Sequence, residues 1–228
     1  MGSKNKLRRF RENETFLNVI QPSRDEITEG FAFKGQWHSF FKNNNPITLE
    51  LGCGKGEYTI ALAKQHPNRN FIGVDIKGAR FWRGAKTAVT EAITNVAFLR
   101  IQIELIDQCF EKDEVNELWI TFPDPQIKYK RTKHRLTNPE FLKKYSHILE
   151  PSGVINLKTD SEFLFGYTLG IIESGNHELL YAHHDIYKNT EAPTDAINTQ
   201  TFYEKQFLEL KKAITYLKFN HVSTDIPP

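Results

Sequence analysis

The stretch Thr48-Leu-Glu-Leu-Gly-Cys-Gly-Lys-Gly56 decides the fold. A short apolar run, typical of a strand, passes directly into glycines at positions 52, 54 and 56. Glycine lets the backbone turn sharply and approach a ligand that a Cβ would exclude. A doubly wound α/β sheet binds its ligands just beyond the carboxyl ends of its strands. The stretch therefore predicts a Rossmann-like sheet with a ligand site at this loop.

Outward from the loop, short apolar runs alternate with helical segments, which is typical of a parallel sheet with crossover helices. The expected strands are 47–51, 70–75, 96–101, 115–122 and 154–158. The expected helices are 57–65, 80–93, 105–110, 139–149 and 162–173. In the tail we expect a polar loop over 181–199, a helix over 202–211 and a late strand over 213–219. The predicted fold class is α/β, with a doubly wound, mostly parallel sheet and helices on both faces.

Composition limits the class of protein. Of the 228 residues, 39% are hydrophobic and 25% are charged, as is ordinary for a soluble globular protein. The net charge is only +2, so a nucleic-acid function has to rest on where the cations lie. The sequence has no apolar run of the roughly 18 residues that a membrane span needs. Two cysteines, too few for a disulfide framework, fit a reducing compartment. We expect a cytoplasmic protein with no membrane association.

The amino-terminal segment is basic. Five cations precede the first acid: Lys4, Lys6, Arg8, Arg9 and Arg11. Such a segment is usually a solvated, frayed terminus, but it becomes a plausible contact if the protein binds RNA. Residues 13–45 hold many aromatic side chains among prolines and glycines and predict an extension packed on the main domain. We therefore divide the chain into a basic arm with its extension, 1–45, and a main domain, 46–228.

Two carboxylates flank the glycine loop. Glu50 precedes it, and Asp75 follows Gly52 by roughly 20 residues, the spacing at which an acid accepts hydrogen bonds from ribose hydroxyls. Glu57 is poorly placed beside a pyrophosphate at a helix N-terminus. S-adenosylmethionine carries a sulfonium and an ammonium, so an acidic, glycine-lined pocket suits it. The simpler alternative is that Asp75 caps a helix and Glu50 pairs with a surface lysine; the joint pattern favours a methyltransferase cofactor site.

A third acid, Asp124, follows the fourth expected strand between two prolines that restrict the backbone on both sides of it. A run of cations comes next: Lys128, Lys130, Arg131, Lys133 and Arg135. These cations are either a solvated loop or, at the ligand-binding edge of the sheet, a rim that attracts phosphates. The pattern indicates an acid for the chemistry and cations for the backbone of a nucleic-acid substrate.

Several motifs together resemble the bacterial tRNA (guanine-N7)-methyltransferases, class I enzymes that use S-adenosylmethionine. They are F-x-N-V from Phe16, E-L-G-C-G-K-G from Glu50, P-D-P followed by Lys128 and the basic run, L-K-T-D from Leu157, and T-F-Y-E from Thr201. The resemblance covers nearly the whole chain. It implies a Rossmann-like methyltransferase domain over 46–228, and it implies methyl transfer to N7 of the guanine in the tRNA variable loop.

The resemblance also implies site residues. Asp124 is the expected catalytic residue. The expected cofactor contacts are Glu50, Gly52, Gly54, Asp75, Gln102 and Asp124. The expected tRNA contacts are Lys128, Asp160, Thr201, Phe202, Tyr203 and Glu204. The sequence departs from the family where Gln102 replaces an acid and Gln126 replaces an aromatic residue.

Some alternatives remain open. Thr201 and Glu204 stand three apart and can instead form a helix capping box, and Asp160 can belong to the N-cap of the next helix. His183-His184-Asp185 lacks further ligand spacing, so we expect no metal. The rival functions are a non-catalytic RNA-binding protein with a methyltransferase fold and a methyltransferase with another substrate. The expected partner is tRNA, and no obligatory protein partner is predicted.

Overall fold

The computed structural model describes residues 3–175 and 177–220. Its strands are β1 Val19–Ile20, β2 Ile47–Leu51, β3 Asn70–Val74, β4 Val96–Leu99, β5 Val115–Thr121, β6 Leu149–Thr159, β7 Glu178–His183 and β8 Thr215–Asn220. Its α-helices are α1 Ser3–Asn13, α2 Arg24–Gly30, α3 Trp37–Phe41, α4 Glu57–Gln65, α5 Gly78–Thr90, α6 Ile106–Cys109, α7 Pro139–Ile148, α8 Glu162–Ser174, α9 Thr194–Ile197 and α10 Phe202–Glu209. Short 3-10 helices are η1 Ile103–Leu105, η2 Tyr129–His134 and η3 Ile186–Lys188.

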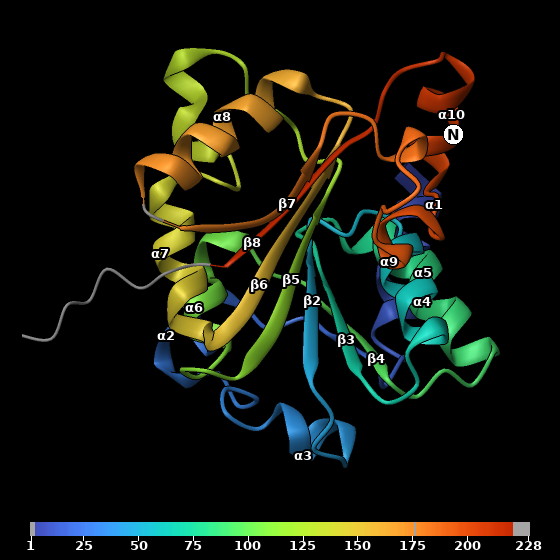
Figure 1. The fold of residues 1–228 in the computed structure, drawn as a ribbon. Helices are drawn as coiled ribbons and strands as arrows, with labels where there is room; N and C mark the ends of the chain where they lie inside the picture. The colour runs from blue at the N-terminus through green and yellow to red at the C-terminus, as the bar shows by residue number, and fades with distance from the viewer. Residues whose placement is uncertain (1–2, 176, 221–228) are drawn as a thin grey trace, which may run out of the picture.

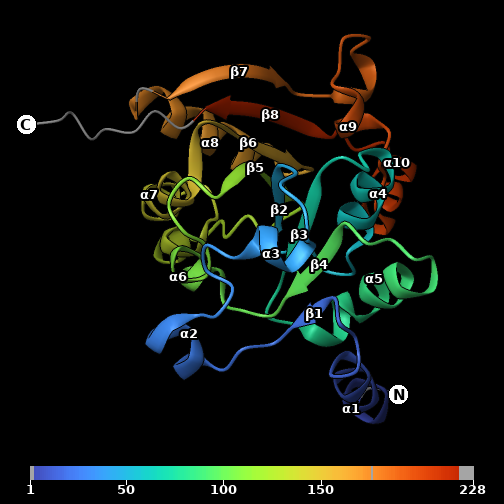
Figure 2. The ribbon, with the colours of Figure 1, turned by 90° about the horizontal axis from the view of Figure 1, so that it is seen from below.

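One sheet runs through the molecule in the strand order β1-β4-β3-β2-β5-β6-β8-β7. Helices α4 and α5 cover one face, and α6, α7 and α8 cover the other (Figure 1). Figure 2, from below, shows the same two helical layers on either side of the strands. The predicted doubly wound α/β class is confirmed.

The strand order reverses at β2, and this reversal creates the site. β2 pairs in parallel with β3 on one side and with β5 on the other. The loops after β2 and β5 therefore leave the same edge of the sheet toward opposite faces, which opens a crevice between them. The glycine loop follows β2 and Asp124 follows β5, so the topology brings both to this crevice. β8 runs antiparallel to both β6 and β7.

Local sequence signals set the helix starts. Ser23 and Glu26 form a capping box at α2, in which each side chain bonds the other residue's backbone N–H. Asn138 caps α7, whose first residue is Pro139. Ser161 caps α8 by accepting from the backbone N–H of Leu164. These caps satisfy backbone donors that a helix start otherwise leaves unpaired.

The amino-terminal segment is not a frayed arm. It forms α1, which packs on α5. The Asn13 side-chain amide donates to the Gly78 carbonyl at 3.0 Å, and the Arg9 guanidinium lies 4.7 Å from the Trp82 ring. Glu12 accepts from the Trp82 indole N–H at 2.9 Å. The apolar body of Trp82 and the helix start of α5 give the basic segment a surface on which to fold. Lys4 is among the residues whose side chains lie outside the described part.

The extension contributes to the core. Trp37 is fully buried, stacks on Phe110 at 5.2 Å between ring centroids, and donates its indole N–H to the Cys109 carbonyl. β1 pairs with β4 and lengthens the sheet. The sequence prediction lacks this two-residue strand, since a strand of that length has no recognisable period.

The expected loop over 181–199 is partly wrong. Tyr181 to His183 belong to β7, and α9 and η3 follow. β7 pairs with β8 on one side, and its residues alternate only between exposed and half-buried. Such an edge strand carries little of the apolar alternation from which strands are predicted.

Gly84 on α5 lets that helix approach the glycine loop. Its backbone N–H donates to the Lys55 carbonyl at 3.0 Å. A Cβ at this position would lie 2.7 Å from the Phe98 ring and 3.0 Å from the Lys55 carbonyl oxygen. Close packing here keeps the loop against α5.

We expect Gly84→Ala to lower the free energy of unfolding by about 1–3 kcal/mol, because overpacking strains the contact with the glycine loop. Gly166→Ala on α8 is the matched control, since a Cβ there meets nothing within 4 Å. It should raise stability by up to about 1 kcal/mol through helix propensity. Urea unfolding of both variants gives the comparison, and equal stabilities would contradict this packing account.

Candidate active site

The glycine loop presents open backbone to the crevice. Gly52 has φ 76° and Gly54 has φ 57°, both in the left-handed region that strains other residues. A Cβ on Gly52 would meet nothing within 4 Å, and one on Gly54 would meet only the Gly52 carbonyl at 3.9 Å. Conformation rather than crowding requires glycine here. The space beside the loop is accessible to a ligand.

Glu50 lies below the loop and is 3% exposed. One carboxylate oxygen accepts from the Thr59 backbone N–H at 2.8 Å and from the Thr59 hydroxyl, and the other accepts from the Thr121 hydroxyl at 2.6 Å. Burial raises the pKa of Glu50 to about 7, and the charge of Asp75 adds to that rise. Glu50 thereby joins β2 to α4 and to the end of β5.

Asp75 holds the loop from the other side. Its carboxylate accepts from the Gly54 backbone N–H at 3.0 Å and from the Lys77 backbone N–H at 2.7 Å. The side chain is largely buried. Each carboxylate oxygen has two lone pairs, so capacity remains for ribose hydroxyls. The alternative role of Asp75 as the cap of the following helix is wrong, because Asp75 accepts from Lys77, which precedes α5, and α5 has no side-chain cap.

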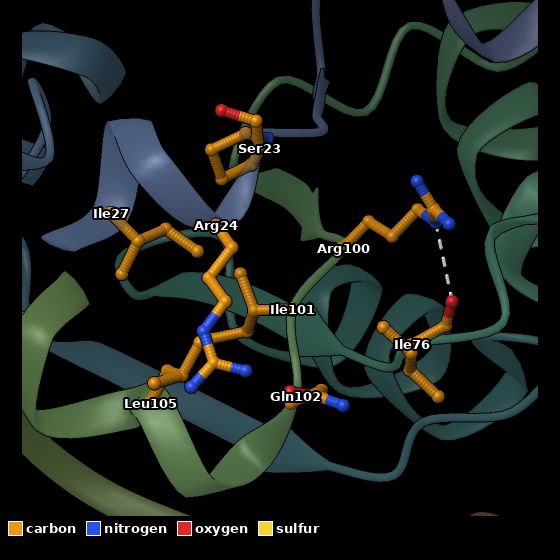
Figure 3. Close-up of a pocket in the computed structure, with 9 residues that line it drawn as sticks. Ser23, Arg24, Ile27, Ile76, Arg100, Ile101, Gln102 and Leu105 are labelled. Carbon is orange, nitrogen blue, oxygen red and sulfur yellow. Dashed lines mark hydrogen bonds between the residues drawn. The ribbon is translucent and has the colours of Figure 1, made fainter.

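A cavity of about 350 Å³ lies beyond the ends of β3 and β4. Ile76, Ile101, Gln102 and Leu105 line it from the sheet side (Figure 3). Its other wall comes from the extension, by way of Pro22, Ser23, Arg24 and Ile27. Gln102 is exposed, so its amide is available to a ligand. The sequence contains the capping box of α2 but no signal that places α2 at this wall.

Asp124 stands on a constrained turn. Phe122 has φ 47° and Gln126 has φ 49°, so two non-glycine residues near Asp124 adopt the left-handed region. The Asp124 carboxylate is exposed and accepts from the Gln126 backbone N–H at 3.0 Å. The turn follows β5, which pairs with β2, so Asp124 lies at the same edge of the sheet as the glycine loop. Strained backbone of this kind is common at functional sites.

Most of the basic run is exposed on η2 and beside it. Lys128, Lys130, Arg131 and Lys133 are exposed, and the Tyr129 side chain is 93% exposed. Arg135 differs, since it is buried. Four of the five expected cations are therefore exposed, as both a solvated loop and a cationic rim require.

The T-F-Y-E segment lies beside the glycine loop. Phe202 and Tyr203 are each 49% exposed. The Lys55 ammonium lies 3.9 Å from the Phe202 ring centroid and 5.5 Å from that of Tyr203. The Glu57 carboxylate accepts from the Phe202 backbone N–H at 2.9 Å. An exposed aromatic pair thus stands at the rim of the crevice.

Thr201 and Glu204 form the capping box of α10, so the structural alternative for this pair is present. Glu204 is fully buried, so in this conformation its carboxylate offers no surface to tRNA. Its carboxylate pairs with the Lys158 ammonium at 2.7 Å and accepts from the Tyr187 hydroxyl at 2.7 Å. Burial lowers the pKa of Lys158, and the Glu204 charge opposes that shift.

Lys158, which is not among the expected site residues, holds the Glu204 side chain from β6. It is fully buried and also donates to the Thr199 carbonyl at 3.0 Å. A lysine inside an otherwise apolar strand was the signal that a buried partner exists. Asp160, two residues on, is half-buried and lies 3.6 Å from the Lys212 ammonium.

Within residues 3–175 and 177–220, no group of three or more His, Cys, Asp or Glu side chains could hold a metal ion. Over the same described ranges, no helix has the length and apolar character needed to cross a membrane.

A doubly wound sheet with a glycine loop after β2, an acid after β3 and an acid after β5 defines a class I methyltransferase fold. Solved structures agree on the fold. The 16S rRNA methyltransferase KamB aligns with a TM-score of 0.63 at 13% identity, over 83% of this chain and 94% of that chain. A 16S rRNA (adenine(1408)-N(1))-methyltransferase from Catenulisporales acidiphilia, solved with its cosubstrate SAM, aligns with a TM-score of 0.52 at 14% identity, over 85% and 93%.

Related sequences identify the family to which the chain belongs within the class I methyltransferases. A family model described as a putative methyltransferase matches residues 44–217. The tRNA (guanine-N(7)-)-methyltransferase of Christiangramia forsetii is 65% identical over 221 residues, which are 96% of this chain and 99% of that protein. The protein of the same name from Porphyromonas gingivalis is 46% identical over 90% of this chain and 85% of its own length. The chain belongs to the tRNA (guanine-N(7)-)-methyltransferase family.

The raised pKa of Glu50 predicts a pH dependence of stability. The folded state keeps the Glu50 proton up to about pH 7, whereas the ordinary value is 4.5. Between these values the folded state binds more protons than the unfolded state, so the free energy of unfolding falls as pH rises. Glu50→Gln cannot titrate. We expect the wild type to lose on the order of 2 kcal/mol more stability than this variant between about pH 5 and pH 7.5.

Urea unfolding of both proteins at the two pH values measures the difference. Comparing the two slopes cancels the titration of every other group. Parallel slopes would show that Glu50 is ionised in the folded protein throughout.

Proposed function

We propose that the protein transfers a methyl group from S-adenosylmethionine to N7 of the variable-loop guanine in tRNA. The observation that carries this proposal is the convergence, at one edge of the sheet, of an acidic glycine loop, an exposed Asp124 and a rim of cations and aromatic rings. Membership of the family supports the same reaction. The proposal includes a cytoplasmic location and no protein partner.

The residues present fit the cofactor. The open face of Gly52 and Gly54 admits a ligand close to the backbone, and the Asp75 carboxylate beside it suits ribose hydroxyls. The cavity has apolar side chains at Ile76, Ile101 and Leu105 and an amide at Gln102, which suit an adenine ring, and its remaining lining includes Arg24 and Arg100. When bound, the cofactor supplies an electrophilic methyl group on a sulfonium. Glu50 supports the loop from below, and a direct contact between its carboxylate and the cofactor is part of the proposal.

Asp124 acts on the substrate side. N7 of guanine has a lone pair ready to attack, so no general base is needed and positioning dominates. As the methyl moves, positive charge develops on the guanine ring, and the exposed Asp124 carboxylate stabilises it or accepts from the base's N1 and N2 hydrogens. A variable-loop guanine is engaged in tertiary pairing, so the base has to be displaced toward the crevice.

The tRNA interface comprises two kinds of residue. Lys128 attracts phosphates, and Phe202 and Tyr203 offer rings on which bases stack. Thr201 and Glu204 act by holding α10 in place. Asp160, which follows β6 and lies beside Lys212, contacts tRNA in this proposal.

The first test is transfer of labelled methyl to two tRNA transcripts. One is unmodified, and the other carries 7-deazaguanosine in place of the variable-loop guanine. We expect label on the first only, because the second lacks the accepting nitrogen. Label on both would place the methyl elsewhere, and label on neither would favour a non-catalytic RNA-binding protein or another substrate.

Asp124→Asn should lower kcat by about 100-fold while the affinities for the cofactor and tRNA stay near those of the wild type, because the charge acts chiefly in the transition state. Asp113→Asn is the control, since Asp113 is exposed before β5, at the opposite end of that strand. Its kinetics should match the wild type. A large loss of cofactor affinity in Asp124→Asn with kcat retained would make Asp124 a binding residue only.

Helix α1 gives a test of the basic amino terminus. Deleting it would uncover Trp82 and Arg100, which contact Arg9 and Phe10. Replacing the exposed Arg8 and Arg11 by Gln removes two charges and keeps the helix, although Arg8 also lies 6.0 Å from the Trp82 ring. We expect weaker tRNA binding, and a slope of log affinity against log salt reduced by up to about 2, with unchanged cofactor affinity.

The control replaces the exposed Lys42 and Lys112, which precede β2 and β5 at the far edge of the sheet, by Gln. This pair removes the same charge away from the crevice and should leave the salt slope unchanged. Equal effects of the two double variants would show that only net charge matters.

A further inference from the structure

Arg135 ends the basic run but does not share the exposure of its neighbours. Its exposed fraction is 5%, whereas Lys130, Arg131 and Lys133 are exposed. Its guanidinium lies 4.8 Å from the Phe163 ring centroid and 4.4 Å from that of Tyr167. These two rings are one turn apart on α8 and form a shelf beneath the cation. Arginine stacks on such rings more readily than lysine does.

The guanidinium donors are directed at the turn that carries Asp124. Both Nε and Nη2 donate to the Gln126 carbonyl at 3.2 Å, and Nη2 also donates to the Ile127 carbonyl at 3.3 Å. Gln126 is one of the two left-handed residues of this turn. A non-glycine residue keeps that conformation only where its surroundings fix it.

The same peptide segment orients the carboxylate. The Gln126 backbone N–H donates to Asp124 Oδ1 at 3.0 Å. Gln126 therefore accepts from Arg135 through its backbone carbonyl and donates to Asp124 through its backbone amide. The Gln126 side chain also accepts from Arg131 Nε at 2.9 Å. A continuous chain of contacts therefore runs from the aromatic shelf of α8 through Arg135 and Gln126 to Asp124.

We propose that Arg135 is a positioning residue for Asp124 and is not a phosphate contact. The proposal rests on the proposed function, in which Asp124 faces the reacting base. Its stacked guanidinium fixes the carbonyls of Gln126 and Ile127 and thereby the direction of the Asp124 carboxylate. A lysine keeps the charge at this position but lacks the fork that reaches two carbonyls and the plane that stacks on two rings.

The test compares Arg135→Lys with Lys133→Gln in steady-state methyl transfer and in tRNA binding at several salt concentrations. For Arg135→Lys we expect kcat to fall by about 10-fold or more, because small misplacements of a catalytic group are costly. Its tRNA affinity and salt slope should stay at the wild-type values. For Lys133→Gln we expect the opposite: weaker tRNA binding, a salt slope reduced by about one, and kcat retained at saturating tRNA.

Tyr167→Leu provides a second variant, since it removes one ring of the shelf while Arg135 remains. It should reproduce the fall in kcat without a change in tRNA affinity. Thermal melting and cofactor binding identify a variant that has failed to fold. Wild-type kcat in both Arg135→Lys and Tyr167→Leu, or loss of tRNA affinity with kcat retained in Arg135→Lys, overturns the inference. Absence of methyl transfer in the wild type would instead overturn the proposed function.

Discussion

The buried carboxylate of Glu50 is the constraint on which the site depends. It accepts hydrogen bonds from Thr59 on α4 and from Thr121 at the end of β5, so one side chain on β2 links both sides of the crevice. The Asp75 carboxylate holds the glycine loop by accepting a hydrogen bond from the Gly54 backbone N–H. Burying a carboxylate is unfavourable unless its oxygens are satisfied. Here that burial is compensated by bonds that fix the distance between the glycine loop and the Asp124 turn.

A buried ion pair holds the outer wall. Lys158 on β6 and Glu204 on α10 are both fully buried, and each makes a further hydrogen bond, Lys158 to the Thr199 carbonyl and Glu204 from the Tyr187 hydroxyl. A buried pair of this kind adds little net stability over apolar residues, but it permits few alternative arrangements. The pair connects α10 to β6 while Phe202 and Tyr203 of the same helix lie beside Lys55.

The central strands of the sheet could be predicted from the sequence, but the edge strands could not. β2 and β3 are buried throughout their length, so their apolar runs predicted them well, and α4 follows the glycine loop over the predicted residues. The edge strands β1 and β7 pair on one side only; β1 has just two residues, and no residue of β7 is buried. In the site, Asp124 could be placed because a strand and two prolines precede and enclose it. The burial of Arg135 could not be predicted, because the two aromatic rings that contact its guanidinium belong to α8. A run of cations does not indicate which of its side chains is buried.

Several acids of this protein are buried, whereas many of its cations are exposed. This difference explains how a chain with a net charge of only +2 is suited to an anionic substrate. Glu50, Asp75 and Glu204 are buried or nearly so, and their hydrogen bonds are made within the protein. Lys128, Lys130, Arg131 and Lys133 remain at the surface, as do Arg8 and Arg11. A phosphate backbone responds mainly to exposed charge, because a buried acid that is locally satisfied contributes a weaker field outside the protein. Net charge therefore understates the attraction of this face for RNA, and exposure decides which cations can take part in it.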